Sequence, residues 1–130
     1  RLDRVVCSPA RRTRETWELA AAQLDSAPEP VYDDRMYAAS GATLLTVLRE
    51  TPENVRGLVV VGHNPAMHDL ALGLADESSD SATLARLRQK YPTSAIAHFI
   101  VETAWSKLAP GRVTLAEFVI PRGDGSENGD

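Results

Sequence analysis

Short apolar runs alternate with amphipathic segments along most of the chain. The runs are bounded by polar or turn-forming residues, which predicts β-strands. They occupy residues 2–7, 57–62, 95–101 and 113–119. Four further segments carry apolar residues at the spacing of one helix face, which predicts four helices. These helices are expected to begin near residues 8, 40, 64 and 81, and the stretch 31–37 fits either a strand or an ordered loop.

This order of elements predicts an α/β fold, a three-layer α/β/α sandwich around a mostly parallel sheet. Residues 58–61 are apolar without alternation, so they predict a central strand that is buried on both faces. The buried face of the first helix is expected to consist of Trp17, Ala20, Ala21 and Leu24. A length of 130 residues predicts one domain, assigned to residues 1–121, and a flexible tail over 122–130, which has no apolar residue.

The composition narrows the class of protein. A net charge of −4 disfavours a globally basic nucleic-acid-binding protein. No apolar stretch approaches the roughly 18–20 residues of a membrane helix. The single cysteine, Cys7, excludes an internal disulfide framework and a cysteine-rich zinc site. Because the sequence shows no signal segment, we expect a cytoplasmic protein, and its many alanines and arginines indicate a bacterial one.

Two strand-to-helix junctions repeat one design, in which an apolar strand is followed by a polar residue, a proline and a helix. The polar residue and proline are Ser8-Pro9 in the first junction and Asn64-Pro65 in the second. Serine and asparagine are favoured helix caps, and proline is favoured at the first helical position, so each helix is expected to start there. If the strands are parallel, both junctions lie at the carboxyl edge of the sheet, where the free amide groups of helix N-termini favour an anion.

The first junction is strongly basic. Arg11, Arg12 and Arg14 lie in the first turns of the predicted helix, where each cation opposes the helix dipole at a cost of about 0.3–1 kcal/mol. The first 16 residues carry five arginines against Asp3 and Glu15, a local charge of +3. This pattern favours a bound phosphate, which arginine holds through two parallel hydrogen bonds. The alternative is that these arginines cover the sheet edge or pair with acids.

The second junction places His63 at the end of a strand, where it is either a catalytic or a structural residue. Other chemistries fit less well. A cysteine phosphatase loop starting at Cys7 needs arginine where the sequence has Thr13, so Cys7 is expected to be a small core residue. His63 and His68 are five positions apart, unlike the pair four apart that binds metal from one helix face. His98 lies in a predicted strand and is expected to be structural.

Both junctions resemble signatures of one family. Residues 8–16 resemble the Ser-Pro-x-x-Arg-x-x-x-Thr signature of the histidine phosphatase superfamily, and residues 62–65 resemble its Gly-His-Asn-Pro turn. The segments 34–40, 92–95 and 118–122 resemble the small SixA-type phosphohistidine phosphatases. The resemblance implies a phosphoglycerate-mutase-like fold and transfer of a phosphoryl group to a histidine and then to water, without metal or cofactor.

The resemblance also implies roles for particular residues. Arg12 corresponds to a phosphate-binding arginine, and His63 to the second histidine of the pocket. Ser8 and Asn64 are expected to support the turns or donate hydrogen bonds to phosphate. Asp34, next to Asp33, is the candidate carboxylate on the substrate side, although an exposed loop acid is the simpler interpretation.

The family's nucleophile, a histidine in an Arg-His-Gly segment, has no counterpart in these 130 residues. We expect that the sequence begins after the first strand and helix of the domain, so that this chain is inactive while its parent is active. The leading hypothesis for the parent is removal of phosphate from phosphohistidine in a protein, by a monomer that binds neither nucleic acid nor membrane. The alternatives are a phosphomonoesterase acting on small phosphate esters and a non-catalytic module that binds phosphate or phosphoproteins.

Overall fold

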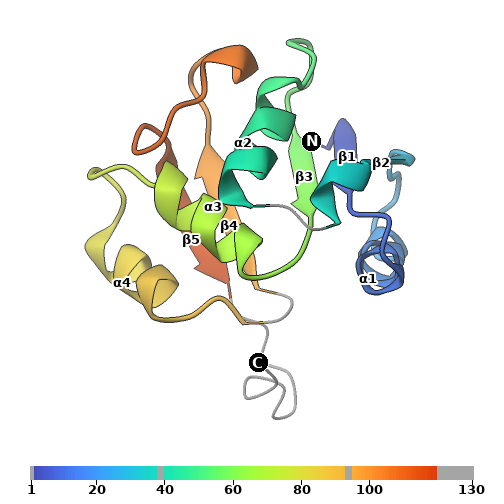
Figure 1. Ribbon diagram of the computed structural model, residues 1–130, viewed down its shortest axis with the longest axis horizontal. Helices are drawn as coiled ribbons and strands as arrows, with labels where there is room; N and C mark the ends of the chain where they lie inside the picture. The colour runs from blue at the N-terminus through green and yellow to red at the C-terminus, as the bar shows by residue number, and fades with distance from the viewer. Residues whose placement is uncertain (1, 38–39, 93–94, 120–130) are drawn as a thin grey trace.

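The computed structural model describes residues 2–37, 40–92 and 95–119, coloured along the chain in Figure 1. The tail predicted over 122–130 therefore lies outside the described residues. Strands are labelled β, α-helices α and 3-10 helices η. In chain order they are β1 (Arg4–Cys7), α1 (Arg11–Ala21), β2 (Pro30–Tyr32), η1 (Asp34–Met36), α2 (Gly41–Arg49), β3 (Leu58–Val61), α3 (Ala66–Leu74), α4 (Ser81–Gln89), β4 (Ile96–Ile100), η2 (Trp105–Lys107) and β5 (Thr114–Val119).

The described strands form two sheets. In the first, β1 lies between β2 and β3, and both pairings are parallel. In the second, β4 and β5 pair antiparallel, with a register shift between His98 and Phe99. The ambiguous stretch 31–37 contributes both the end of β2 and the 3-10 helix η1.

The prediction that residues 58–61 form the central strand is wrong, because β1 holds that position. Val5 and Cys7 of β1 are fully buried, whereas all four residues of β3 are only half-buried. A continuous apolar run indicates that helices cover both faces of a strand, and helices do cover both faces of β3. Such a run does not indicate how many strands pair with it, and β3 pairs with β1 alone among the described strands.

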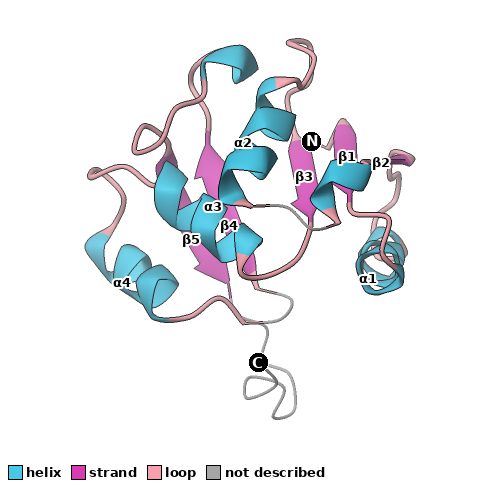
Figure 2. Cartoon of the chain, viewed as in Figure 1, coloured by secondary structure: helices cyan, strands magenta, loops and turns pink. Residues whose placement is uncertain are grey.

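Helices cover the two faces of the first sheet, which confirms the three-layer α/β/α architecture (Figure 2). On one face, Trp17 of α1 packs against Val5 and Cys7. On the other face, Val6 joins a core cluster with residues of α2 and α3, among them Leu44. Neighbouring residues of β1 therefore reach opposite layers, as the strand repeat of two residues requires.

The β4–β5 hairpin is covered by α4, and this packing confirms the helix predicted from residue 81. Leu87 of α4 is fully buried in a cluster with Leu115 and Phe118 of β5. A neighbouring cluster joins Leu48 and Leu74 to the segment before β5. These contacts attach the hairpin to α2 and α3, and no described strand of one sheet pairs with a strand of the other.

Two helix starts differ from the prediction. Helix α1 begins at Arg11 with Ala10 as its cap residue, so Ser8 is not the cap, and α3 begins at Ala66 with Pro65 in the cap position. The predicted buried face of α1 is also only partly correct. Trp17 is buried, but Ala20 is exposed and Leu24 lies beyond the helix end and is 44% exposed. Ala21, the last residue of the helix, is half-buried and packs against the same cluster as Trp17.

Candidate functional site

The parallel pairing of β1 and β3 brings the two junctions together at the carboxyl edge of the sheet. Cys7 and Val61 are partners in the register, so Ser8 and the turn at Gly62 follow directly side by side. The amide of Ser8 donates to the carbonyl oxygen of Val61 over 2.9 Å. Across the two junctions, Ser8 Oγ lies 2.8 Å from His63 Nε2.

Ser8 is held from three sides and is fully buried. Its Oγ accepts a hydrogen bond from the amide of Ala10, at 3.3 Å. Its carbonyl oxygen accepts from the hydroxyl of Thr13, at 2.8 Å, and from the thiol of Cys7, at 3.3 Å. The start of α1 is thereby tied to the end of β1. A side chain in this position supports the turn and cannot itself meet a bound molecule.

Cys7 is a core residue, as the sequence predicted. It is fully buried beside Val5 and Trp17. Burial raises the pKa of its thiol, and this effect outweighs the opposing hydrogen bond to Thr13 and the charge of Arg14. A protonated, enclosed thiol is a poor nucleophile, so the geometry excludes Cys7 as the reactive group.

His63 projects from the turn after β3 and is partly exposed. Its carbonyl oxygen accepts the amide of Met67, at 2.9 Å, which fixes the turn to α3. A Cβ atom on Gly62 would lie only 3.0 Å from Sδ of Met67, so the close approach of this turn to α3 favours glycine. The ring of Tyr37 is 6.2 Å from the imidazole. Within the described chain, Nδ1 of His63 has no hydrogen-bond partner.

Arg12 lies in the first turn of α1, and its side chain is exposed. Its guanidinium makes no hydrogen bond or ion pair with any described residue, whereas neighbouring Arg11 pairs with Glu15 at 3.0 Å. The first turn of α1 contains no acidic residue, and Ala10 offers no side-chain cap. The positive end of this helix, which follows Ser8 in the chain, therefore keeps free amide groups and an arginine without a partner among the described residues.

The structure places Asn64 and Asp34 differently from Ser8 and His63. The side-chain amide of Asn64 donates to the carbonyl oxygen of Tyr91, at 2.7 Å, and so anchors the segment that follows α4. Asp34 is exposed at the start of η1, a helix joined to β1 by the bond from the Asp33 amide to the Cys7 carbonyl oxygen. Asp34 is therefore near the carboxyl edge but not in the Ser8–His63 contact.

The carboxylate of Asp33 is engaged in structural contacts. Its carboxylate caps η1 and pairs with Arg35 at 2.7 Å, and Arg35 also pairs with Glu50. The hydrogen bond from the Arg35 side chain lowers the pKa of Asp33, so this carboxyl stays ionised near neutral pH. It is unsuited to donate a proton as a general acid.

The other two histidines contact groups outside the Ser8–His63 pair. His68 Nε2 lies 2.6 Å from the carbonyl oxygen of Leu87, and its ring packs against that of Tyr91. His98 is exposed on β4 and lies 3.3 Å from the carboxylate of Glu117.

Among the described helices, none is long and apolar enough to span a membrane.

Two residues of the site were not predicted. Thr13 is buried and links Ser8 to α1 through its hydroxyl. A polar residue four positions before Trp17, on the inward face of the helix, was the available signal. Tyr37 is 66% exposed beside His63, and its only signal was its place in the segment 34–40, which resembles the SixA-type proteins.

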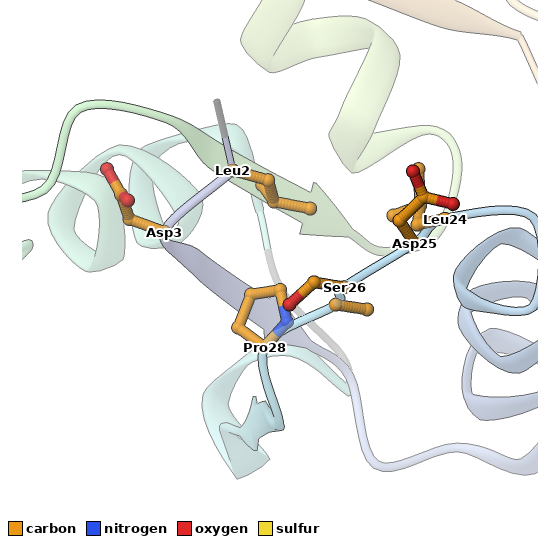
Figure 3. A pocket seen from close by; sticks show the side chains of 7 residues that line it. Leu2, Asp3, Leu24, Asp25, Ser26 and Pro28 are labelled. Atoms are coloured by element: carbon orange, nitrogen blue, oxygen red, sulfur yellow. The ribbon is translucent and has the colours of Figure 1, made fainter.

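Two hollows in the surface lie away from these residues. One, of about 750 Å³, lies at the amino end of β1 and is lined by residues such as Leu2 and Pro28 (Figure 3). The other, of about 410 Å³, lies between α2 and α3. Neither contains Ser8 or His63. The site at the junctions is accordingly defined by its polar groups, and we expect it to be shallow.

Relatives in mycobacteria match nearly the whole chain. The uncharacterized proteins MT1313 and Rv1276c of Mycobacterium tuberculosis are each 38% identical over 122 residues, which is 93% of this chain and 75% of theirs. The uncharacterized protein ML1117 of Mycobacterium leprae is 30% identical over 122 residues, which is 73% of its length. No family model matches the sequence.

Solved structures resemble the fold closely. A SixA structure from Nakamurella multipartitia is 29% identical with a TM-score of 0.78, over 94% of this chain and 72% of that one. A SixA structure from Agrobacterium tumefaciens is 28% identical with a TM-score of 0.67, over 93% and 69%. Both carry the name phosphohistidine phosphatase. The histidine phosphatase SixA complexed with tungstate is 20% identical with a TM-score of 0.69, over 92% and 69%, and shows the fold alone.

These likenesses agree with the junction geometry and define an α/β protein of the phosphoglycerate-mutase-like fold. The two SixA structures at 29% and 28% identity support a SixA-like relationship of this chain to the histidine phosphatase superfamily. A phosphatase function within this superfamily is therefore supported.

Proposed function

We propose that this chain forms the phosphate-binding part of a phosphatase that removes phosphate from phosphohistidine in a protein. The observation that carries the proposal is the 2.8 Å contact between Ser8 Oγ and His63 Nε2. It joins the two signature segments, which lie 55 positions apart in the sequence, at the start of a helix with an unpaired arginine. The names of the SixA neighbours support the same substrate class.

In the proposed mechanism, Arg12 and His63 bind the phosphoryl group. Phosphoryl transfer passes through a loose transition state in which charge spreads over three equatorial oxygens. A guanidinium and an imidazole held in place before the reaction stabilise that charge without reorganisation. The free amide groups at the start of α1 add to the same field.

The proposed substrate also agrees with the carboxylates near the site. A phosphorylated imidazole leaves more easily than an alkoxide, so the reaction needs no strong general acid. Asp33 is held by Arg35, and Asp34 is an exposed residue outside the Ser8–His63 contact. A sugar phosphate, by contrast, requires a proton donor for its leaving oxygen.

A non-catalytic module that binds phosphoproteins is the second candidate. The observation that favours it is that the exposed Arg12 and the partly exposed His63 can bind an anion without a nucleophile. The two candidates share the anion site and differ only in turnover.

A phosphomonoesterase for small esters is a further alternative, distinguished by its preference for p-nitrophenyl phosphate over a phosphohistidine peptide.

Anion binding tests the proposed site. Titration of the chain with inorganic phosphate or tungstate, followed by NMR, is expected to shift signals of α1 and of the turn at His63. Arg12→Ala is expected to weaken binding roughly tenfold or more, since a hydrogen bond to a charged group contributes about 1.5–3 kcal/mol. Arg88→Ala, which removes an exposed arginine from α4, is the matched control. Equal affinity in the two variants would remove Arg12 from the site.

A further inference from the structure

The contact between Ser8 and His63 contains information about where the proton of the imidazole lies. Ser8 Oγ has two neighbours within hydrogen-bond distance among the described residues, the amide of Ala10 at 3.3 Å and His63 Nε2 at 2.8 Å. Ser8 is fully buried, so water does not replace a missing partner. A buried hydroxyl group whose proton has no acceptor is costly.

The number of donors and acceptors around Ser8 Oγ then shows which atom of the Ser8–His63 contact donates the proton. The amide of Ala10 can only donate, so it occupies a lone pair of the Ser8 oxygen. The hydroxyl proton of Ser8 needs an acceptor, and His63 Nε2 is the one that the described residues provide. If Nε2 carried the proton of a neutral imidazole, Ser8 Oγ would accept twice and its own proton would have no partner.

We propose that Ser8 is a positioning residue that holds neutral His63 in the tautomer with the proton on Nδ1. In a histidine, the hydrogen bond made by one ring nitrogen sets the protonation of the other. Nδ1 has no partner within the described chain, so its N–H is available as a hydrogen-bond donor. Its ligand is an oxygen of the phosphoryl group, and this part of the inference rests on the proposed function.

The surroundings of Ser8 keep this arrangement rigid. The hydroxyl of Thr13 lies 2.8 Å from the carbonyl oxygen of Ser8, and the amide of Ser8 is bound to Val61. On the other side, the backbone of His63 is bound to Met67 of α3. Separate elements thus fix the backbone of Ser8 and the backbone of His63. The relative position of the two side chains is therefore restricted.

Long-range ¹H–¹⁵N NMR of the imidazole rings tests the tautomer directly. The spectrum is recorded at alkaline pH, and a His63→Gln variant assigns the His63 signals. The expected result is a protonated Nδ1 and an unprotonated Nε2 in the unmodified chain. A protonated Nε2 overturns the proposal, and this measurement requires no variant of Ser8.

Ser8→Ala tests whether the hydroxyl group is the cause. We expect the proton of neutral His63 to move toward Nε2, the nitrogen that carries it preferentially in a free histidine side chain. Ser106→Ala, an exposed serine on η2, is the matched control and is expected to leave the tautomer unchanged. An unchanged tautomer in folded Ser8→Ala overturns the assigned role. Ser8→Thr, which retains the hydroxyl, is expected to restore the Nδ1–H form.

Anion titration separates this inference from the proposed function. Inorganic phosphate is expected to shift the ¹⁵N signal of His63 Nδ1 more than that of Nε2, and Ser8→Ala is expected to weaken phosphate binding several-fold. If phosphate shifts signals of α1 but not Nδ1 of His63, the donor role is overturned and the phosphate site stands. If phosphate shifts neither, the proposed function fails, and the tautomer is decided by the first measurement alone.

Discussion

Thr13 is the residue on which the first junction depends most. Its hydroxyl lies 2.8 Å from the carbonyl oxygen of Ser8 and 2.9 Å from that of Ala10, and its side chain is buried. It therefore ties the carbonyl groups of Ser8 and Ala10, which precede α1, to the first turn of the helix. The nearby Ser8 contributes its own hydroxyl to His63 and is not available for this purpose.

Replacing Thr13 with valine is expected to destabilise the fold by about 1–3 kcal/mol, because the buried carbonyl group of Ser8 loses its hydroxyl donor and keeps only the weak thiol donor of Cys7, while the shape is retained. Urea unfolding measures the change. The matched control is Thr16→Val on the exposed side of the same helix, where the threonine hydroxyl donates to the carbonyl oxygen of Arg12. The control is expected to change stability by less than about 0.5 kcal/mol. Equal losses in the two variants would contradict the role of Thr13.

At the scale of elements, the N-terminus of α4 is capped by the side chain of Asp80. Asp80 accepts hydrogen bonds from the amide and the hydroxyl of Thr83, both at 3.0 Å. These two bonds, the amide first, lower the pKa of Asp80 from its ordinary value of 3.8. Since α4 is the helix that covers β5, its cap also supports the packing of Leu87 in the core.

Asp80→Ala is expected to lower the melting temperature at neutral pH, and the loss is expected to shrink in acid. The folded-state pKa lies below the unfolded one, so the stabilisation is complete above the ordinary value and disappears as the pH falls through the folded-state value. Thermal unfolding at about pH 7 and about pH 2 checks both statements. Glu77→Ala, an exposed acid just before α4, is the control. A loss that is the same at both pH values would contradict the argument.

The helix starts show why element boundaries were predicted less well than the elements. Ser40 caps α2 as expected, since its side chain accepts from the amide of Thr43. Ser8 has the same local sequence signal but is not a cap, because its hydroxyl faces His63 from a distant part of the chain. A local pattern cannot report a competing partner 55 positions away.

At the scale of the whole molecule, binding and turnover can be separated. The chain brings together Ser8 and His63 beside the start of α1, but its sequence contains no Arg-His-Gly segment. We expect the 130-residue chain to bind phosphate and to show no phosphohistidine phosphatase activity above that of its His63→Ala variant. Release of phosphate from a phosphohistidine peptide, measured with and without a metal chelator, checks this. Robust turnover would show that another group in these residues acts as the nucleophile.

The sequence by itself determined the α/β class, the four helices, the pairing of two similar junctions and the candidates Arg12 and His63. The class, the helices and the junctions follow from local periodicity and from the repeated cap-and-proline pattern. His63 was indicated by its place at a strand end, and the resemblance to the family signature singled out Arg12 among three arginines. The tertiary structure alone decided that β1 is the central strand of the described sheet, that the side chain of Asn64 donates to the carbonyl oxygen of Tyr91, and that the hydroxyl of Ser8 contacts the imidazole of His63. The physical reason is that strand neighbours and hydrogen-bond partners are chosen by contacts between distant segments, which no local pattern records.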